Sequence, residues 1–168
     1  MSQTSSKPAP IAIKPFEESI LRQYGDMLLD LSSSILWSQT EGRKIVRQVL
    51  EKLQKQSRHL QPERYQRAWV LQNACQLLQK TAIKSTRTLT PSEQAMVDSI
   101  KEPTERLVQL ESYFHRLHLN EQILLLLRDK YGIPYPEIAI AMHMPEDSLK
   151  VMRQQALETL ERWVWCHA

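Results

Sequence analysis

The sequence has little of what sheets, disulfide frameworks and membrane spans require. Its 168 residues include only 3 glycines and 2 cysteines, and no apolar run approaches the length needed to cross a membrane. The strict alternation of apolar and polar residues that marks a strand does not persist for more than a few residues. The sequence therefore predicts an all-α protein, and its length allows either one domain or two small helical domains.

Cysteines and histidines are too few and too scattered to predict a metal or disulfide centre. Cys75 falls within an apolar helical run, which favours a buried free thiol over a disulfide with Cys166. His115 and His118 lie three residues apart, but no further cysteine or histidine pair supports them as metal ligands. The first residues lack the apolar core of a secretion signal. We expect no metal, no cofactor and a reducing, cytoplasmic compartment.

Motifs that carry covalent chemistry are also missing. The sequence contains no glycine-rich phosphate loop, no nucleophile elbow and no paired-carboxylate arrangement, so we expect a binding protein rather than an enzyme. The formal net charge of +3 is uneven: residues 1–80 hold 12 Lys/Arg against 7 Asp/Glu, and residues 81–168 hold 10 against 12. A basic first half suits an anionic partner such as nucleic acid, although so modest an excess also suits an ordinary solvated surface.

Helical periodicity divides the chain into two helical domains. In the first, apolar residues recur at three- and four-residue spacing from about residue 16 to 34, a second helix starts with Thr40 as its N-cap, and Pro62 opens a third. A Thr-Pro-Ser-Glu capping signal lies in the connection to the second domain. The predicted organisation is a disordered tail, a three-helix domain, a linker with a short helix and a helix-turn-helix domain, at residues 1–15, 16–82, 83–103 and 104–168.

The strongest local pattern is a helix-turn-helix within residues 119–163. Asn120 is expected to cap the first helix of this segment, and Gly132 to end that helix in a left-handed turn. The two helices that follow can pack closely only if a small residue lies between them, and Ala139 fills that position. His143 stands at the turn position, where glycine is usual, and histidine tolerates a positive φ better than most residues. The required apolar positions are all filled, by Ile138, Met142, Met144, Leu149 and Met152.

Residues 117–160 resemble the fourth region of bacterial sigma factors, particularly that of the extracytoplasmic-function group. The family pattern is a leucine-rich helix ending in Leu-Arg, then Gly-hydrophobic-Ser-Tyr-x-Glu-Ile-Ala, then Pro-Glu-Gly-Thr-Val-Lys-Ser-Arg. Ser148 and Leu149 are near-equivalents of the Thr-Val pair. The matching residues are Leu126, Leu127, Arg128, Gly132, Tyr135, Glu137, Ile138, Ala139, Pro145, Glu146, Lys150, Ala156 and Leu160.

The first domain resembles the second region of the same family, through its length, its three helices and the segment Arg67-Ala68-Trp69. In the family the second region binds core RNA polymerase and melts promoter DNA, and the fourth region reads an element further upstream. The resemblance therefore implies a transcription protein whose partners are promoter DNA and core RNA polymerase. It places four residues of the last helix in the major groove: Ser148, Lys150, Arg153 and Gln154. It implies phosphate contacts near the first domain from Arg67, Lys80, Lys84 and Arg87.

Charges at both expected interfaces depart from the family pattern. In the helix that engages the polymerase clamp, Lys44, Arg47 and Gln48 replace the Asp, Gln and Glu of the family. Such a reversal should weaken a complementary interface. Residues 146–163 carry a net charge of −1, which is unfavourable for binding phosphates. Three arginines of the family's last helix are replaced here, by Met152, Gln155 and Leu157.

These departures keep a second hypothesis open, in which the chain is a degenerate sigma-like module that no longer reads promoters and acts through protein–protein contacts. Its partner would be an anti-sigma factor or another protein. The C-terminal Trp163 and Trp165 are equally suited to closing the core of the helix-turn-helix and to forming an exposed apolar contact. The candidate partner-binding residues are these two tryptophans together with Arg43, Lys44, Arg47 and Gln48.

Overall fold

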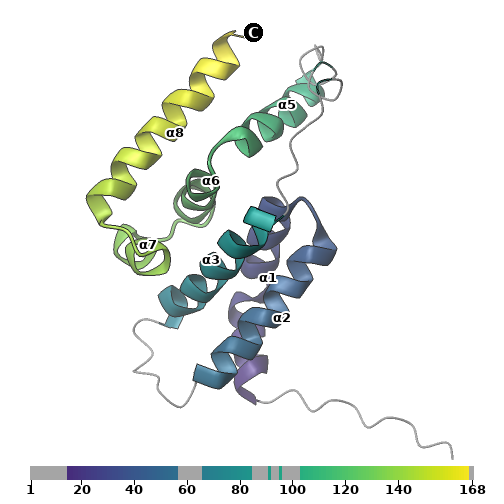
Figure 1. Cartoon of the computed structure of the whole chain (residues 1–168), viewed down its shortest axis with the longest axis vertical. Coiled ribbons are helices and arrows are strands. Elements are labelled where there is room, and N and C mark those ends of the chain that lie inside the picture. Colours follow the sequence, from purple (N-terminus) through teal and green to yellow (C-terminus); the bar gives the residue numbers. More distant parts are fainter. Residues whose placement is uncertain (1–14, 57–65, 85–90, 92–94, 96–102, 167–168) are drawn as a thin grey trace, which may run out of the picture.

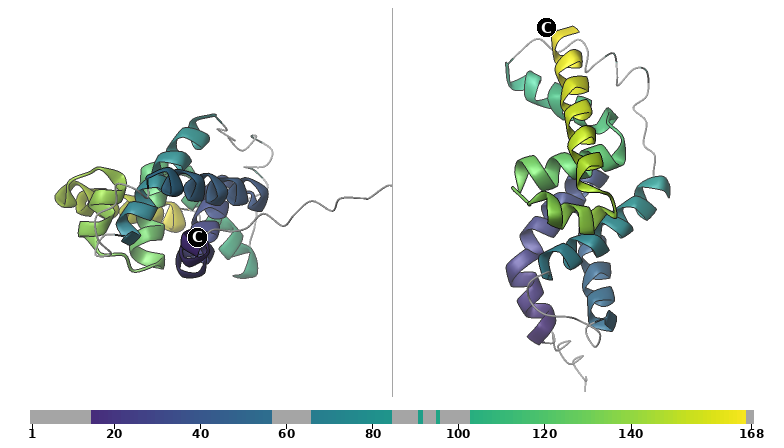
Figure 2. Two further views of the ribbon diagram at one scale, coloured as in Figure 1. Left: turned by 90° about the horizontal axis from the view of Figure 1, so that it is seen from below. Right: turned by 90° about the vertical axis from the view of Figure 1, so that its left-hand side faces the viewer.

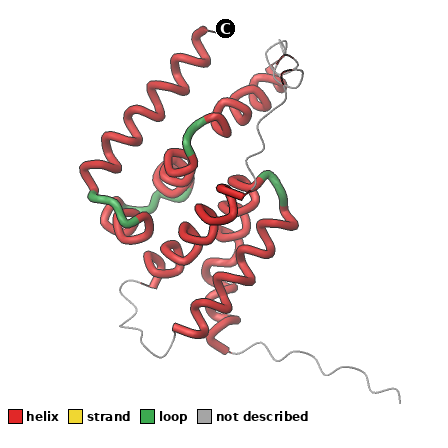
Figure 3. Tube along the Cα trace, viewed as in Figure 1, coloured by secondary structure: helices red, strands yellow, loops and turns green. Residues whose placement is uncertain are grey.

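The computed structural model describes residues 15–56, 66–84, 91, 95 and 103–166, and every regular element within them is helical (Figure 3). The all-α prediction is confirmed. No helix in this part of the chain is long and apolar enough to cross a membrane. In chain order the elements are α1 (Pro15–Leu36), α2 (Gln39–Gln56), α3 (Gln66–Lys84), α5 (Pro103–Arg116), α6 (Leu119–Leu125), the π-helical η3 (Leu126–Lys130), α7 (Tyr135–Met142) and α8 (Glu146–Cys166).

Helices α1, α2 and α3 pack into a three-helix unit (Figure 1). The turn from α1 into α2 is made at Trp37, which has a left-handed φ of 55°. Gly42 lets the two helices approach closely, because a Cβ atom here would overlap Ser33 Oγ and lie 2.9 Å from the Ser33 backbone nitrogen. The side chains buried in this unit recur at helical spacing. They include Ile20, Leu28, Leu31, Ile45, Val49, Leu53, Leu71 and Leu78.

Helices α5 to α8 form a second unit, in which α6 continues into η3 and α7 leads into the long α8. Gly132 follows η3 with a φ of 66°, which confirms the predicted left-handed turn. Helix α8 runs beside α5 toward the C-terminus (Figures 1 and 2). A small apolar cluster lies among α5, α6 and α8. It consists of Leu117, Leu125 and Ala156, with Phe114, Leu157, Leu160 and Trp163 packed against them.

The two units share one apolar core. Helix α3 packs along α7, and both α1 and α3 contact α6. The main buried cluster therefore continues from Leu28, Val49 and Leu78 in the first unit to Leu124 and Ile138 in the second. This arrangement seats the helix-turn-helix against the first unit.

Two predicted N-caps are wrong by two residues. The Ser38 Oγ atom accepts the hydrogen bond from the Glu41 backbone N–H at 3.2 Å, so Ser38 caps α2 and Thr40 lies inside the helix. In the same way His118 is the N-cap of α6, and Asn120 lies inside that helix. In both cases the helix begins before the position that the sequence suggested, since a second polar residue stands two places earlier.

Part of the predicted organisation lies outside the described residues. This applies to the tail up to residue 14, to Pro62 as the start of the third helix, and to most of the linker between residues 85 and 102. The described part of the third helix begins at Gln66. The division into domains at residues 82 and 103 stays a prediction.

Candidate nucleic-acid interface on the helix-turn-helix

Helices α7 and α8 form the predicted helix-turn-helix. Ala139 is packed against the core, and its carbonyl accepts hydrogen bonds from the backbone N–H groups of His143 and Met144. His143 has a φ of 52° and a ψ of 45°, so it takes the left-handed conformation that glycine usually supplies at a helix end. The five predicted apolar positions are all in the core or packed against it. They are Ile138, Met142, Met144, Leu149 and Met152.

Three of the four predicted groove residues are exposed on α8. They are Ser148, Lys150 and Gln154. The Lys150 Nζ atom lies 5.6 Å from the centre of the Tyr135 ring, and Gln154 Nε2 donates to Glu158 Oε1 at 2.9 Å. Both contacts lie at the protein surface, where DNA could displace them. These side chains therefore meet the first requirement for reading base edges, which is access from solvent.

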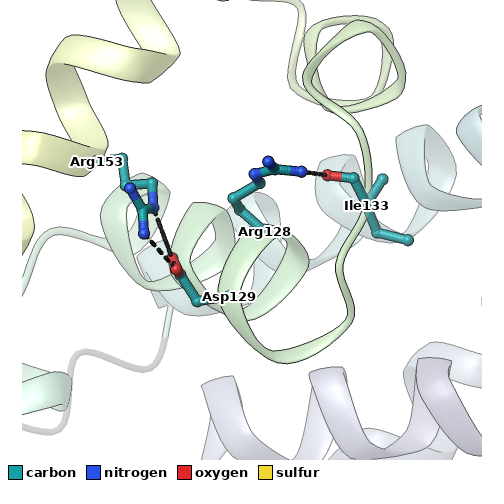
Figure 4. Close-up of polar contacts among 4 residues, drawn as sticks. All are labelled: Arg128, Asp129, Ile133 and Arg153. Atoms are coloured by element: carbon teal, nitrogen blue, oxygen red, sulfur yellow. Dashed lines mark hydrogen bonds and ion pairs between the residues drawn. The ribbon is translucent and has the colours of Figure 1, made fainter.

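Arg153, the fourth predicted groove residue, is bound within the molecule. Its guanidinium donates to both carboxylate oxygens of Asp129, from Nε to Oδ2 at 2.9 Å and from Nη2 to Oδ1 at 2.5 Å (Figure 4). Hydrogen bonding to Asp129 raises the pKa of Arg153 above its ordinary value. The nearby Arg128 donates to the Ile133 carbonyl at 3.2 Å. Arg153 can contact a base or phosphate only after Asp129 releases it.

A shallow hollow of about 470 Å³ lies between the start of α6 and the first turns of α8. Val151, at its edge, is 57% exposed. Methionine side chains adapt to partners of different shape, whereas carboxylates repel phosphate. The hollow therefore suits a protein side chain better than a DNA backbone. Its lining consists of Glu121, Met144, Asp147, Ser148, Val151, Met152 and Gln155.

Arg67, a predicted phosphate contact, lies at the interface between the two units. Its Nε donates to Glu137 Oε2 at 2.7 Å and its Nη2 to Oε1 at 3.0 Å, and this pairing raises the pKa of Arg67. Lys80 is exposed on the same helix. The side chain of Lys84 and the whole of Arg87 lie outside the described residues. A phosphate-binding role for these four residues stays a prediction, and for Arg67 it requires the Glu137 pair to open.

Further polar contacts join the units, and sequence reasoning missed them. Asp30 of α1 accepts hydrogen bonds from Tyr131 Oη and, at 2.7 Å, from Lys130 Nζ. Burial acts to raise the pKa of Asp30, but these two hydrogen bonds outweigh it and hold the pKa below its ordinary value. The side chains of Gln72 and His143 meet at 2.5 Å. The helix-turn-helix is thus tied to the first unit by polar contacts as well as by apolar packing.

The candidate partner-binding residues of the first unit lie together on α2. Arg43, Lys44, Arg47 and Gln48 are all exposed. Lys44 Nζ pairs with Glu41 Oε1 at 2.7 Å, one turn earlier on the same helix. The face that the sequence predicts to be basic is therefore present and open to solvent.

The two C-terminal tryptophans occupy different environments. Trp163 is partly buried, packs on the small apolar cluster of the second unit, and has its ring centre 6.0 Å from that of Tyr113. Trp165 is 72% exposed, two residues further along α8. Of the two roles considered for the pair, core packing fits Trp163 and an exposed contact fits Trp165.

An aromatic contact between the α1–α2 turn and α5 was also missed. Trp37 is 48% exposed, and its ring centre lies 4.1 Å from that of His115. The ring of Phe114 packs against the same histidine at 5.3 Å. Burial lowers the pKa of His115 to about 4. A left-handed tryptophan has no sequence signal, because bulky residues rarely take a positive φ.

Neither cysteine is bonded, and Cys75 is fully buried as the sequence predicts, whereas Cys166 is exposed. Burial raises the pKa of the Cys75 thiol to about 12. Across the described ranges no group of three or more His, Cys, Asp or Glu side chains could hold a metal ion.

The sequence matches no protein-family profile and no curated protein. Solved structures do share its fold. CnrH, solved in complex with the cytosolic domain of CnrY, superposes with a TM-score of 0.70 at 13% identity, covering 94% of this chain and 92% of CnrH. The sigma factor RpoE of Bartonella quintana, solved with the anti-sigma factor NepR, gives a TM-score of 0.65 at 12% identity, covering 90% of this chain and 98% of RpoE. The resemblance to sigma factors is thus confirmed at the level of fold.

Proposed function

We propose that this chain is a sigma-factor-type transcription regulator that binds promoter DNA through α8 and core RNA polymerase through its first helical unit. The observation that carries the proposal is the complete helix-turn-helix, in which buried Ile138 and Leu149 hold α8 with Ser148, Lys150 and Gln154 exposed. A helix held in this way can enter the major groove. The fold shared with the sigma factor RpoE is a second support.

The mechanism is binding rather than covalent chemistry. Lys150 would contact a phosphate, and Gln154 would reach a base edge. Arg153 would join them once DNA competes with Asp129 for its guanidinium. That competition is feasible because the Arg153 and Asp129 side chains are 32% and 40% exposed, and ion pairs at such positions stabilise a protein by only about 0–1 kcal/mol.

DNA binding is tested with the full chain and a pool of random duplexes, because the target sequence is unknown. A recovered duplex is labelled, and its affinity is measured by fluorescence anisotropy over a range of salt concentrations. We expect the affinity to fall steeply with salt, and to fall with Lys150→Ala and Arg153→Ala, since each removes a cation. Arg162→Ala, an exposed cation far along α8, is the matched control. Failure to retain any duplex at low salt would contradict the proposal.

Polymerase binding needs a separate test. The full chain is incubated with purified core RNA polymerase, and complex formation is followed by size-exclusion chromatography. We expect the complex to form without DNA, because the first unit would make the contact with the polymerase. The absence of a complex would refute the polymerase part and leave the DNA part standing.

A second candidate function is docking to a protein partner through α8, and the hollow beside that helix is the observation that favours it. Val151 offers exposed apolar surface there, and Glu121 and Asp147 give it a negative charge that suits a basic segment. CnrH and RpoE were both solved with a protein bound. This candidate would make the chain a sigma-like adaptor that an anti-sigma type of protein recognises.

Val151→Arg separates the two candidates. The added cation should strengthen duplex binding, because it increases the positive charge facing phosphates. The same change places a large charged group over the hollow and should abolish capture of a protein partner in a pull-down from the native cell. Loss of both duplex binding and partner capture would indicate that the variant is misfolded. The thermal unfolding temperature of the variant shows whether this is so.

A further inference from the structure

The outward face of α2 is fixed by the residues that the helix buries. Gly42, Ile45, Val49 and Leu53 are buried against the rest of the first unit. At 100° per residue, the opposite side of the helix carries a different set of side chains, all exposed. These are Arg43, Lys44, Arg47, Gln48, Glu51 and Lys55, called here the α2 basic face.

Three of the four cations of this face have no partner among the described residues, whereas other cations of the molecule are neutralised internally. The side chains of Arg43, Arg47 and Lys55 make no hydrogen bond or ion pair with another described residue, and Lys44 pairs with Glu41 on the same helix. By contrast, Arg67 is held by Glu137 and Arg153 by Asp129. Over its whole length α2 carries five Lys or Arg against two Glu. Among the described residues of the first unit, unpaired positive charge is therefore concentrated on α2.

The position of α2 separates this charge from the helix-turn-helix. Helix α2 packs on α1 and α3, and α3 in turn packs on α7. In Figure 1, α3 lies between α2 and the α7–α8 pair. The α2 basic face and the exposed side of α8 are therefore separate surfaces, with α3 between them.

We infer that the α2 basic face docks an acidic segment of a protein partner. Arginine side chains form paired hydrogen bonds with carboxylates, and Arg43 and Arg47 are neighbours on successive turns. From Arg43 to Lys55 the face extends about 18 Å, the length of a short helix or loop of the partner. The inference goes beyond the proposed function and stands whether or not α8 binds DNA.

A protein segment fits this face better than a nucleic acid strand does. Glu51 lies among the cations, and its carboxylate would repel a continuous row of phosphates. An acidic protein segment can place a lysine or an amide opposite Glu51 while its carboxylates meet the arginines. Gln48, also on this face, adds an amide that can both donate and accept hydrogen bonds. The mixture of groups is that of a protein-recognition surface.

The test measures binding of the full chain to a fluorescein-labelled peptide of about 20 residues that alternates glutamate pairs with alanine and leucine. A single-stranded oligonucleotide and a duplex of equal charge serve as competing probes. Arg47→Glu and the double variant R43E/R47E are compared with Arg162→Glu, which makes the same charge change on an exposed residue of α8. Circular dichroism checks that each variant is folded, and R43Q/R47Q replaces the double variant if that one unfolds.

The inference predicts that R43E/R47E weakens peptide binding by about tenfold or more, that Arg47→Glu weakens it by about threefold, and that Arg162→Glu changes it by less than twofold. An equal loss with Arg162→Glu would mean that net charge alone attracts the peptide, and would overturn the inference. Tighter binding of either nucleic acid, lost in R43E/R47E, would overturn it in favour of a nucleic-acid surface. No binding of the peptide to wild-type protein at low salt would also overturn it. None of these outcomes bears on the Lys150→Ala test of DNA binding.

Discussion

Arg67 of α3 and Glu137 of α7 form a two-pronged ion pair that joins the first helical unit to the helix-turn-helix, with N–O distances of 2.7 and 3.0 Å. The two side chains are 70 residues apart in sequence and are 39% and 23% exposed. The resemblance to sigma factors gave them separate roles, Arg67 in phosphate binding and Glu137 in the helix-turn-helix segment. In the folded chain the two side chains form an ion pair with each other.

A double-mutant cycle measures what this pair contributes. Arg67→Ala, Glu137→Ala and the double variant are unfolded in urea, and their free energies of unfolding are compared with that of the wild type. Because the pair is partly buried and doubly hydrogen-bonded, we expect a coupling free energy of about 1 kcal/mol. A coupling indistinguishable from zero would show that this ion pair does not stabilise the contact between the two units.

Two glycines in the first unit should respond in opposite ways to alanine. At Gly42 a Cβ would overlap Ser33 on α1, so Gly42→Ala should destabilise the protein by about 1–3 kcal/mol. At Gly25 a Cβ would meet only Leu21, at 3.6 Å, so Gly25→Ala should stabilise α1 by up to about 1 kcal/mol. The thermal unfolding temperatures of both variants, compared with that of the wild type, test these two predictions. A neutral or stabilising Gly42→Ala would contradict the close approach of α1 and α2.

His115 should make the protein less stable in acid. Burial lowers its pKa in the folded state to about 4 from the ordinary 6.5, so between these values the unfolded chain takes up the proton more readily than the folded one. The free energy of unfolding should therefore fall as the pH drops from 6.5 toward 4.

His115→Phe keeps an aromatic ring beside Trp37 and cannot be protonated. The difference in stability between this variant and the wild type isolates the histidine, because carboxylates that titrate in the same window affect both proteins. We expect the difference to widen in favour of the variant between pH 6.5 and 4, measured by urea unfolding at each pH. A difference that stays constant over that range would contradict the burial of His115.

The two thiols should differ in their reaction with a maleimide. Cys166 is exposed, whereas Cys75 is fully buried with its pKa raised to about 12, so little thiolate forms at neutral pH. In the native protein we expect one thiol to react quickly and the second only in denaturant, as counted by mass spectrometry. Cys166→Ser provides the control, which should leave no fast-reacting thiol.

The helix-turn-helix could be predicted from the sequence because its requirements are local. A small residue at Ala139, a left-handed turn at His143 and buried Ile138 and Leu149 all lie within a dozen residues, and each demands a particular side chain. The N-caps were less certain, since Ser38 and Thr40 can both cap a helix and only the backbone decides between them.

The contacts between the units could not be predicted in this way. Asp30 and Tyr131 are 101 residues apart, and no local pattern shows that the helices bearing them meet. The partnership of Asp129 with Arg153 likewise depends on how η3 and α8 pack. For this reason the sequence could place the four candidate groove residues on the last helix, but it could not show that Arg153 is already paired.

The affinity of Asp129→Asn for a selected duplex tests most directly whether α8 binds DNA and whether Asp129 holds Arg153 away from it. This change keeps the shape of the side chain, removes one negative charge and frees Arg153 to contact DNA. We expect about threefold to tenfold tighter binding than wild type in anisotropy titrations, with a steeper dependence on salt, and no gain when Arg153→Ala is also present. Binding that is unchanged by Asp129→Asn, or absent in all these proteins at low salt, would contradict this expectation.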